Sequence, residues 1–288
     1  MCADSRSQRW RDRRMSFTGK SRVIDPSIHA VDVIPCHSVA KPFVERHHYS
    51  SSFPATRLSC GLFRNEGARS SLVGVASFSV SMNSAAGPKY TGMDDGSSVE
   101  LGRLVLLDHI EGNAESWFMS RAFSLLRAEK PSIEAVYAYS DPVPRIDPEH
   151  GVIMPGHIGE IYQALNAQCR GRSRPRTHYT TPDQKLFSER ALSKIRLGER
   201  GSDYAERDLM ERGAPRRLAG ETGRDWIGRL MDTGFIGTRR HPGNWIYAFG
   251  LTRKAKARSR SMPSVTYPRR TGNGRDVSDR QDELDFAA

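Results

Sequence analysis

Cysteines and long apolar runs are both scarce in this chain, and each absence excludes a class of protein. The four cysteines, Cys2, Cys36, Cys60 and Cys169, are widely scattered and form no CxxC pair. This spacing argues against a zinc ribbon and a dense disulfide framework, and free thiols in a reducing cytoplasm are the expectation. No apolar stretch approaches the ~18 residues of a membrane-spanning helix. We therefore expect a soluble, cytoplasmic protein that makes no contact with membranes.

Apolar residues are also few, at 37% of 288, whereas Lys and Arg outnumber Asp and Glu by 44 to 33. A core of ordinary size can form only if part of the chain stays outside it. The net charge of +11 favours a polyanionic partner. A merely basic protein with solvated charges is the alternative, and a homodimer is compatible with either interpretation.

Composition changes along the chain predict three regions. Residues 1–28 are rich in Arg and Ser and predict a disordered basic arm, because they lack the apolar stretch of a secretory signal. Residues 29–251 predict one catalytic domain, interrupted at about 172–240 by a polar, mainly helical insertion. Residues 252–288 are first basic and then acidic, and predict a disordered tail.

Apolar periodicity within residues 29–251 predicts alternating strands and helices. Strands are expected at 31–34, 59–63, 71–82, 99–107, 133–139 and 245–251, and helices at 38–48, from 113–116 onward and from 157 onward. This order is typical of an α/β fold with a mixed central sheet flanked by helices. The polar helical insertion then comes just before the last strand.

Two short motifs could carry catalytic groups to the edge of this sheet. His48 and Tyr49 end the predicted helix at 38–48, and their side chains can relay protons or bind a metal. A surface pair without a role is the alternative. Asp141 follows a strand, at the edge where ligands of open α/β sheets collect. Its carboxylate could act as a base or metal ligand, or could form an ordinary turn before Pro142.

The strand at 99–107 contains two charges, Glu100 and Arg103, which are costly to bury without partners. Because they are an odd number of residues apart, we expect them on opposite faces of the sheet. Asn113 or Ser116 could cap the following helix, whose free N–H groups suit a phosphate. A capped helix without a ligand is the alternative.

Tyr162 and a row of arginines complete the candidate residues. The phenol of Tyr162, on the helix that begins near 157, could donate a proton to a leaving group or could simply pack. Arginines at every second position would present one row of positive charge to DNA phosphates if the segment is extended. They are Arg170, Arg172, Arg174 and Arg176, and basic residues at 239–241 and 253–260 add to them. Solvated charge is the alternative.

Five motifs in this order resemble the Mom family of bacteriophage DNA-modification proteins. They are His48-Tyr49, Glu100-Leu101-Gly102-Arg103-Leu104, the run from Ser116 to Ala122, Tyr139-Ser140-Asp141-Pro142, and the run from Gly156 to Ala164. The resemblance covers roughly residues 30–180, with a weaker similarity at 222–251. It implies an acetyltransferase-like (GNAT) fold. It also implies conversion of the adenine N6 amine in phage DNA to a carbamoylmethyl derivative, which protects that DNA from host restriction.

Transferred position by position, the resemblance also implies roles for individual residues. His48, Tyr49 and Asp141 would form a catalytic or iron-binding group, and His47, His150 or His157 could supply a second imidazole. Tyr162, Arg103 and Ser116, with Asn113 beside them, would line a site for an acyl-CoA such as acetyl-CoA. The loop at 108–115 departs from ordinary acetyltransferases, since it has one glycine and three acids and suits a pyrophosphate poorly.

Two other functions remain open. One is a GNAT-type enzyme that acylates a protein or small-molecule amine. The other is a DNA-binding protein that keeps the fold without catalysis. The mass of the nucleosides in DNA from cells that express the protein distinguishes all three.

Overall fold

The computed structural model describes residues 7–11, 14–18, 23–50, 52–147, 151–154, 156–183 and 185–269. Of these, 7–11, 14–18, 95, 145–147 and 151–153 are described by their backbone only. The chain divides into two units. Unit 1 is formed by residues up to Arg145, by Val152–Ser173 and from Asn244 onward, and unit 2 mainly by Arg174–Gly243.

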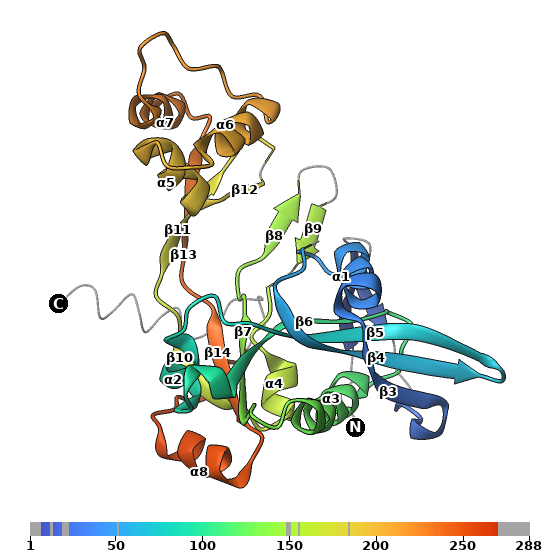
Figure 1. The fold of residues 1–288 in the computed structure, drawn as a ribbon. Helices are drawn as coiled ribbons and strands as arrows, with labels where there is room; N and C mark the ends of the chain where they lie inside the picture. Colours follow the sequence, from blue (N-terminus) through green and yellow to red (C-terminus); the bar gives the residue numbers. More distant parts are fainter. Residues whose placement is uncertain are drawn as a thin grey trace. The chain divides into compact units, whose positions relative to one another are not determined.

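Unit 1 is built on a seven-stranded sheet with the strand order β10-β14-β7-β6-β5-β4-β3 (Figure 1). The strands are β3 (His29–Ile34), β4 (Thr56–Glu66), β5 (Arg69–Ser79), β6 (Ser98–Leu106), β7 (Ala135–Ser140), β10 (Gln168–Arg172) and β14 (Trp245–Gly250). Neighbours pair antiparallel except β6 and β7, which are parallel. The expected α/β fold with a mixed central sheet flanked by helices is therefore confirmed.

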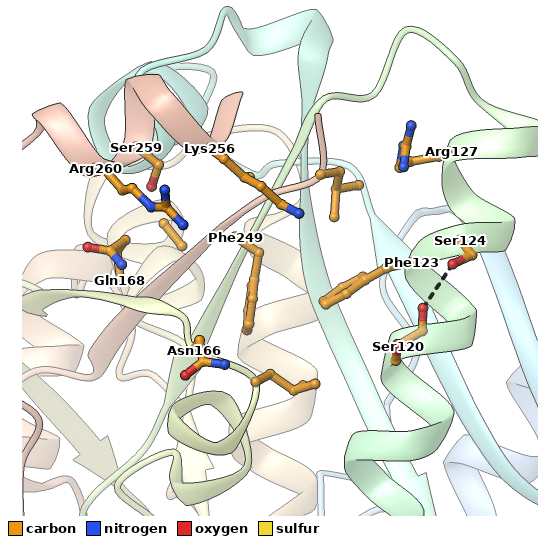
Figure 2. A pocket seen from close by; sticks show the side chains of 14 residues that line it. Ser120, Phe123, Ser124, Arg127, Asn166, Gln168, Phe249, Lys256, Ser259 and Arg260 are labelled. Carbon is orange, nitrogen blue, oxygen red and sulfur yellow. Dashed lines mark hydrogen bonds between the residues drawn. The ribbon is translucent and has the colours of Figure 1, made fainter. Parts of the chain in front are cut away.

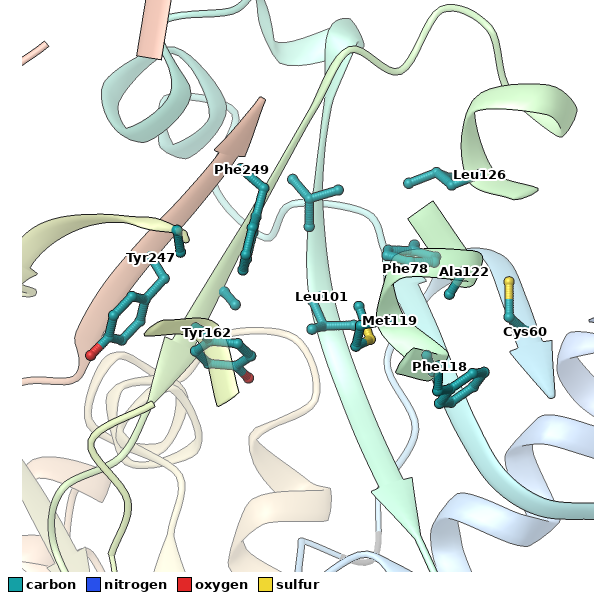
Figure 3. Close-up of a cluster of buried hydrophobic side chains, with 14 of the residues drawn as sticks. Cys60, Phe78, Leu101, Phe118, Met119, Ala122, Leu126, Tyr162, Tyr247 and Phe249 are labelled. Atoms are coloured by element: carbon teal, nitrogen blue, oxygen red, sulfur yellow. The ribbon is translucent and has the colours of Figure 1, made fainter. Parts of the chain in front are cut away.

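One face of this sheet is covered by the helix α3 (Ala114–Glu129), which buries one side of itself in the largest core (Figure 3). Phe118, Met119, Ala122 and Leu126 are fully buried, and their spacing of three or four residues places them on one side of a helix. They pack in one cluster with alternate residues of the β4–β5 hairpin, such as Leu62. The expected amphipathic helix is confirmed.

The other face is covered by a shorter helix, α1 (Lys41–His47), preceded by a π-helical turn, η2 (Cys36–Ala40). Ala40 and Val44 are fully buried in a cluster that includes Val75 of β5 and Val105 of β6. The backbone turns extended at His48, whose N–H still donates to the Val44 carbonyl at 2.8 Å. The helix expected at 38–48 is therefore shorter and begins at Lys41.

Several smaller elements complete unit 1 and its borders. They are β1 (Ser7–Arg11), β2 (Arg14–Thr18), η1 (Pro26–Ile28), α2 (Ala86–Thr91), η3 (Asp95–Ser97), β8 (Arg145–Asp147), β9 (Gly151–Met154), α4 (Glu160–Ala164) and α8 (Arg253–Ser261). α2 lies in a segment rich in Gly and Ser, between two of the expected strands. In the part of the chain that is described, no helix is long and apolar enough to cross a membrane.

Two segments expected to be disordered contain ordered residues. Within 1–28, β1 pairs with β2, Ile24 is buried in the core, and its N–H donates to the Gly112 carbonyl at 3.0 Å. Within 252–288, α8 is capped by Thr252, whose hydroxyl accepts from Ala255 N–H at 3.1 Å. Burial of Ile24 and Ala255 explains the order, since both side chains are removed from water. Residues 270–288 lie outside the described residues.

Unit 2 has its own small sheet and three helices. Its strands are β11 (Arg176–Thr180), β12 (Leu186–Phe187) and β13 (Gly237–His241), in the order β12-β11-β13. Its helices are α5 (Glu189–Leu197), α6 (Ser202–Glu211) and α7 (Gly223–Asp232). Trp226 is fully buried at the centre of a core with Leu192, Leu209 and Leu230. The expected polar, helical insertion at 172–240 corresponds closely to this unit.

Unit 2 interrupts the chain between two neighbouring strands of the unit 1 sheet. β10 ends at Arg172 and its partner β14 begins at Trp245. The ends are tied together, because Ser173 N–H donates to the Asn244 carbonyl at 2.8 Å and Asn244 N–H donates to Ser173 Oγ at 2.9 Å.

Candidate active site

The central feature of unit 1 is a gap in the pairing of its two parallel strands. β6 and β7 pair from Ser98 and Ala135 only as far as Glu100 and Tyr137. Both strands continue beyond this point, to Leu106 and Ser140. We call the place where they stop pairing the β6–β7 opening. Groups from both faces of the sheet can approach each other there.

A bulge in β6 determines which side chains face the opening. Glu100 and Arg103 stand opposite Ser79 and Ser77 of β5, which are two residues apart and therefore on one face. The register shift at Gly102 thus turns Glu100 and Arg103 to the same face, and our expectation of opposite faces is wrong. A Cβ at Gly102 would lie 2.2 Å from Ser79 Oγ, so this bulge requires glycine.

Glu100 lies among tyrosines at the opening. Burial raises the pKa of its carboxyl group, and the charge of Arg103 and a hydrogen bond with Tyr137 partly offset this effect. The rings of Tyr90, Tyr137 and Tyr139 have centroids 5.7 to 6.1 Å apart. Burial also raises the pKa of Tyr139. A buried carboxyl group with a raised pKa, beside phenols, is suited to exchanging protons.

Sequence reasoning placed Glu100 and the tyrosines of β7 in separate motifs. Two tyrosines at alternate positions of a strand, with a charged residue in a neighbouring strand, are the signal that could have found this group. Only the parallel pairing of Glu100 with Tyr137 joins them, and these residues are distant in the chain.

Tyr162 reaches the same region from the other face of the sheet. It is buried among Tyr247 and Phe249, with ring centroids at 5.3 and 6.1 Å (Figure 3). Burial raises the pKa of its phenol, and the nearby Tyr49 and Glu100 raise it further. The structure therefore brings Tyr162 near both Tyr49 and Glu100, which belong to separate sequence motifs.

Gly159 makes the burial of Tyr162 possible. Its φ is +75°, and a Cβ there would lie 2.4 Å from Tyr247 Cε2 and 2.9 Å from Tyr162 Cδ2. We expect Gly159→Ala to lower the free energy of unfolding by about 2–5 kcal/mol, from the left-handed backbone and from overpacking. Gly67→Ala is a matched control, since φ is +60° there and nothing lies within 4 Å of the added Cβ. Urea unfolding of both variants measures this, and equal losses would contradict the packing argument.

His48 and Tyr49 lie at the end of α1, on the face that carries Glu100. Their rings stack, with centroids 4.3 Å apart, and His48 Nδ1 lies 2.8 Å from Ser50 Oγ. Arg103 ties the following loop to β6, because its Nε donates to the Ser52 carbonyl and its Nη2 to Ser52 Oγ, each at 2.8 Å. Arg103 was expected beside an acyl-CoA, but these donors serve the protein itself.

Asp141 is buried just after β7 and forms the turn that was the alternative to a catalytic role. Its Oδ1 accepts from Val143 N–H at 3.0 Å, and its carbonyl accepts from His157 N–H at 2.7 Å. The His157 ring meets the edge of Tyr162 with centroids 6.5 Å apart. Asp141 is thus linked to the Tyr162 segment through His157.

The family resemblance implies that His48, Tyr49 and Asp141 bind iron. Among the described residues, no three His, Cys, Asp or Glu side chains gather closely enough to hold a metal ion. Tyrosines are not among these side-chain types, so the set of His48, Tyr49 and Asp141 as iron ligands stays a prediction. His150, one of the residues considered as a second imidazole, lies outside the described residues.

The N-terminus of α3 does not fit a pyrophosphate. Asn113 occupies the cap position with φ +61° but makes no side-chain cap, and Ser116 Oγ donates back to the Asn113 carbonyl at 3.1 Å. Glu115 lies in the first turn, and Glu111 contacts Arg64 at 3.5 Å. The expected side-chain cap is therefore wrong for Asn113, and the acids oppose a phosphate.

The predicted row of arginines is broken in the structure. A register shift with Gly171 at φ +79° lies between Cys169 and Arg172, so alternation is lost. Arg170 donates to the carbonyls of Tyr90, Ser259 and Pro263, at 2.8, 2.6 and 2.8 Å. Arg172 lies over the Trp245 ring at 4.8 Å. The donors of Arg170 are thus used within the protein, whereas Arg174 and Arg176 are exposed.

A pocket of about 650 Å³ lies beside Tyr162 and Arg170, because Phe249 and Ser259, which contact them, line it (Figure 2). It is lined by Phe123 of α3, Phe249 of β14 and Lys256 of α8, among others. Phe249 pairs with Val136 at the start of β7, whereas Asp141 follows its end. None of the predicted catalytic residues lines this pocket.

Comparisons with known proteins identify a relative and a family for this chain. The chain is 29% identical over 174 residues to the protein named "Methylcarbamoylase mom" of Escherichia phage Mu. This match covers 59% of the chain and 65% of that relative, so the chain spans just under two thirds of the relative's length.

A solved structure of a tandem GNAT protein from the clavulanic acid biosynthesis pathway also resembles the chain. The match has a TM-score of 0.38 and 10% sequence identity, and covers 78% of this chain and 99% of that one. A likeness at this level carries no argument about function. The family model described as the Mom protein family matches residues 29–222, which is more than half of the chain. The chain therefore belongs to the Mom protein family.

Proposed function

We propose that this protein is a phage-type DNA-modification enzyme that transfers a carbamoylmethyl group to the N6 amine of adenine in double-stranded DNA. Membership of the Mom family and the name of the phage Mu relative support this proposal. The excess of positive charge supports a polyanionic substrate. Protection of the modified DNA from restriction enzymes would follow.

The reaction presents one chemical difficulty. The N6 lone pair of adenine is delocalised into the ring, so the amine is a weak nucleophile, and it is paired within the duplex. When the N6–carbon bond forms, the amine must lose one proton and the donor must release its leaving group. We assign the first role to Glu100, as the base that accepts the N6 proton, and the second to Tyr162, as the acid that protonates the leaving group.

The observation that carries this assignment is the half-buried Glu100 carboxyl at the β6–β7 opening, with its raised pKa. Arg103 has a positioning role, since it holds the loop after His48 and Tyr49 against β6. An acyl-CoA-type donor and iron are further proposals that come from the family resemblance. The roles assigned to Glu100 and Tyr162 depend on neither the acyl-CoA-type donor nor iron. Adenine is expected to leave the base stack to reach the site.

Nucleoside mass analysis tests the proposal directly. DNA from bacteria that express the protein is digested, and deoxyadenosine is expected to gain the mass of one carbamoylmethyl group. Unmodified nucleosides together with an acylated protein or metabolite would instead support the GNAT-type alternative. Unmodified nucleosides with salt-dependent duplex binding would support a non-catalytic DNA-binding protein.

Asp141 allows its two possible roles to be separated. We expect Asp141→Ala to abolish adenine modification while duplex binding stays intact. Asp141→Asn keeps an oxygen that can accept from Val143 N–H, so it preserves the turn and removes only the charge. If the carboxylate is catalytic, both variants lose modification. Full modification by Asp141→Asn would limit Asp141 to forming the turn.

A further inference from the structure

Unit 2 presents a narrow β-ribbon formed by β11 and β13 (Figure 1). The two strands pair without a break from Arg176 opposite His241 to Thr180 opposite Gly237. β12 joins only the last two positions of β11, Tyr179 and Thr180. The rest of β11 therefore pairs with β13 alone, as a two-stranded ribbon.

The ribbon is strongly basic. Arg174, Arg176, Arg239 and Arg240 are all exposed, and neither strand contains an acidic residue. In the described part of unit 2, ion pairs join other cations to acids, such as Arg212 to Asp208. None of the four ribbon arginines takes part in these pairs. The positive charge of the ribbon is therefore not balanced by acids of its own strands, whereas the cations of helices α5 to α7 are largely balanced by acids in the same helices.

Side chains on one face of the ribbon are held in place by each other. Arg176 and His241 stand opposite, as do His178 and Arg239, so all four share a face. Arg176 Nε donates to His178 Nε2 at 2.9 Å, and the rings of His178 and His241 have centroids 4.6 Å apart. Arg176 is thereby partly ordered before any partner binds, which lowers the entropy cost of binding.

The far end of the ribbon is anchored in the unit 2 core. Tyr179 packs against the cluster that contains Phe187, Trp226 and Ile236. Arg196 of α5 lies over the Tyr179 ring at 5.8 Å. The ribbon is therefore fixed at both ends, by this core at one end and by the bonded pair Ser173 and Asn244 next to the other, and is not a free loop.

We propose that this ribbon, residues 174–178 with 239–241, lies in the major groove of duplex DNA. The inference rests on the proposed function. Two strands lie about 5 Å apart, and the major groove, about 12 Å wide, admits such a ribbon. Its arginines can pair with phosphates and with guanine edges. Adenine N6 lies in the same groove, so the ribbon holds the duplex on the side where the target atom is exposed.

The first test removes ribbon charge. We expect Arg239→Gln with Arg240→Gln to weaken binding of a plain duplex on the order of 30-fold at 0.15 M salt. The slope of log affinity against log salt should fall by about 2, since each lost phosphate contact contributes about 0.9. Arg200→Gln with Arg207→Gln is the matched control, because it removes the same charge from exposed positions of unit 2 outside the ribbon, in the turn before α6 and in α6. Equal weakening by both pairs, or none by the ribbon pair, overturns the inference.

The second test addresses the groove. A duplex whose cytosines carry glucosylated hydroxymethyl groups has a filled major groove, and wild-type protein should bind it at least tenfold more weakly than plain duplex. Netropsin, which occupies the minor groove, should leave binding unchanged. Equal affinity for the two duplexes overturns the groove assignment. The proposed function is tested separately, by the nucleoside masses in DNA from cells that express the wild-type protein. If that DNA contains modified adenine while the ribbon variant binds duplex as tightly as wild type, only the proposed role of the ribbon is refuted.

Discussion

Replacing Glu100 by glutamine should lower the rate of adenine modification by about 10²–10⁴-fold and leave duplex affinity unchanged. Glutamine keeps the shape of the side chain and can still hydrogen-bond Tyr137, but it cannot accept the N6 proton. The measurement is the fraction of modified deoxyadenosine after a fixed time, beside a duplex-binding titration. A rate equal to wild type would remove Glu100 from the reaction.

The pH dependence of the same variant distinguishes a base from a structural residue. Because burial raises the pKa of Glu100, the wild-type rate should rise with pH through that raised pKa, as the carboxyl loses its proton. The residual rate of Glu100→Gln should lack this rise. The free energy of unfolding depends on pH in the opposite direction to the rate. Because the pKa of Glu100 is raised, the folded state binds this proton more tightly than the unfolded state does. Wild-type stability should therefore fall as pH rises from about 4.3 through the folded pKa, and that of Glu100→Gln should not.

Trp226→Ala should destabilise unit 2 by about 3–5 kcal/mol. The indole is fully buried at the centre of a small core, and its Nε1 donates to the Pro215 carbonyl at 2.8 Å. Removing it leaves both a cavity and an unsatisfied carbonyl. Hydrogen exchange of residues 174–243 is the measurement, and their amides should exchange much faster than in wild type.

A matched control for Trp226→Ala lies in the same unit. Leu218 is 63% exposed, and Leu218→Ala should change stability by no more than about 0.5 kcal/mol. If the ribbon holds the duplex, Trp226→Ala should also weaken duplex binding, because Tyr179 of the ribbon packs on this core. Unchanged exchange in Trp226→Ala would mean that the core of unit 2 does not depend on the indole.

The elements that the sequence predicts well are those with local, periodic burial. Phe118, Ala122 and Leu126 recur at helical spacing and are all buried on one side of α3. The β4–β5 hairpin follows from alternation around the turn at Gly67, where φ is +60°. Such patterns depend only on residues that are close together in the chain, so these elements can be predicted from one sequence.

The site was less predictable because its geometry depends on two irregularities and on distant contacts. The bulge at Gly102 reverses the face expected for Arg103 relative to Glu100. The shift at Gly171 breaks the arginine row, and carbonyls remote in the chain bind Arg170. A glycine in a strand signals that a bulge is possible, but its partner strand decides whether the bulge forms.

The junction of the two units has a practical consequence. Because Ser173 and Asn244 are hydrogen-bonded to each other, β10 and β14 form a hairpin in which unit 2 takes the place of the connecting turn. Such a body can be excised and its ends rejoined by a short turn without disturbing the strands on either side. The chemistry proposed for unit 1 and the duplex binding proposed for unit 2 would then be separable parts of one chain, and unit 2 could be exchanged for another DNA-binding module.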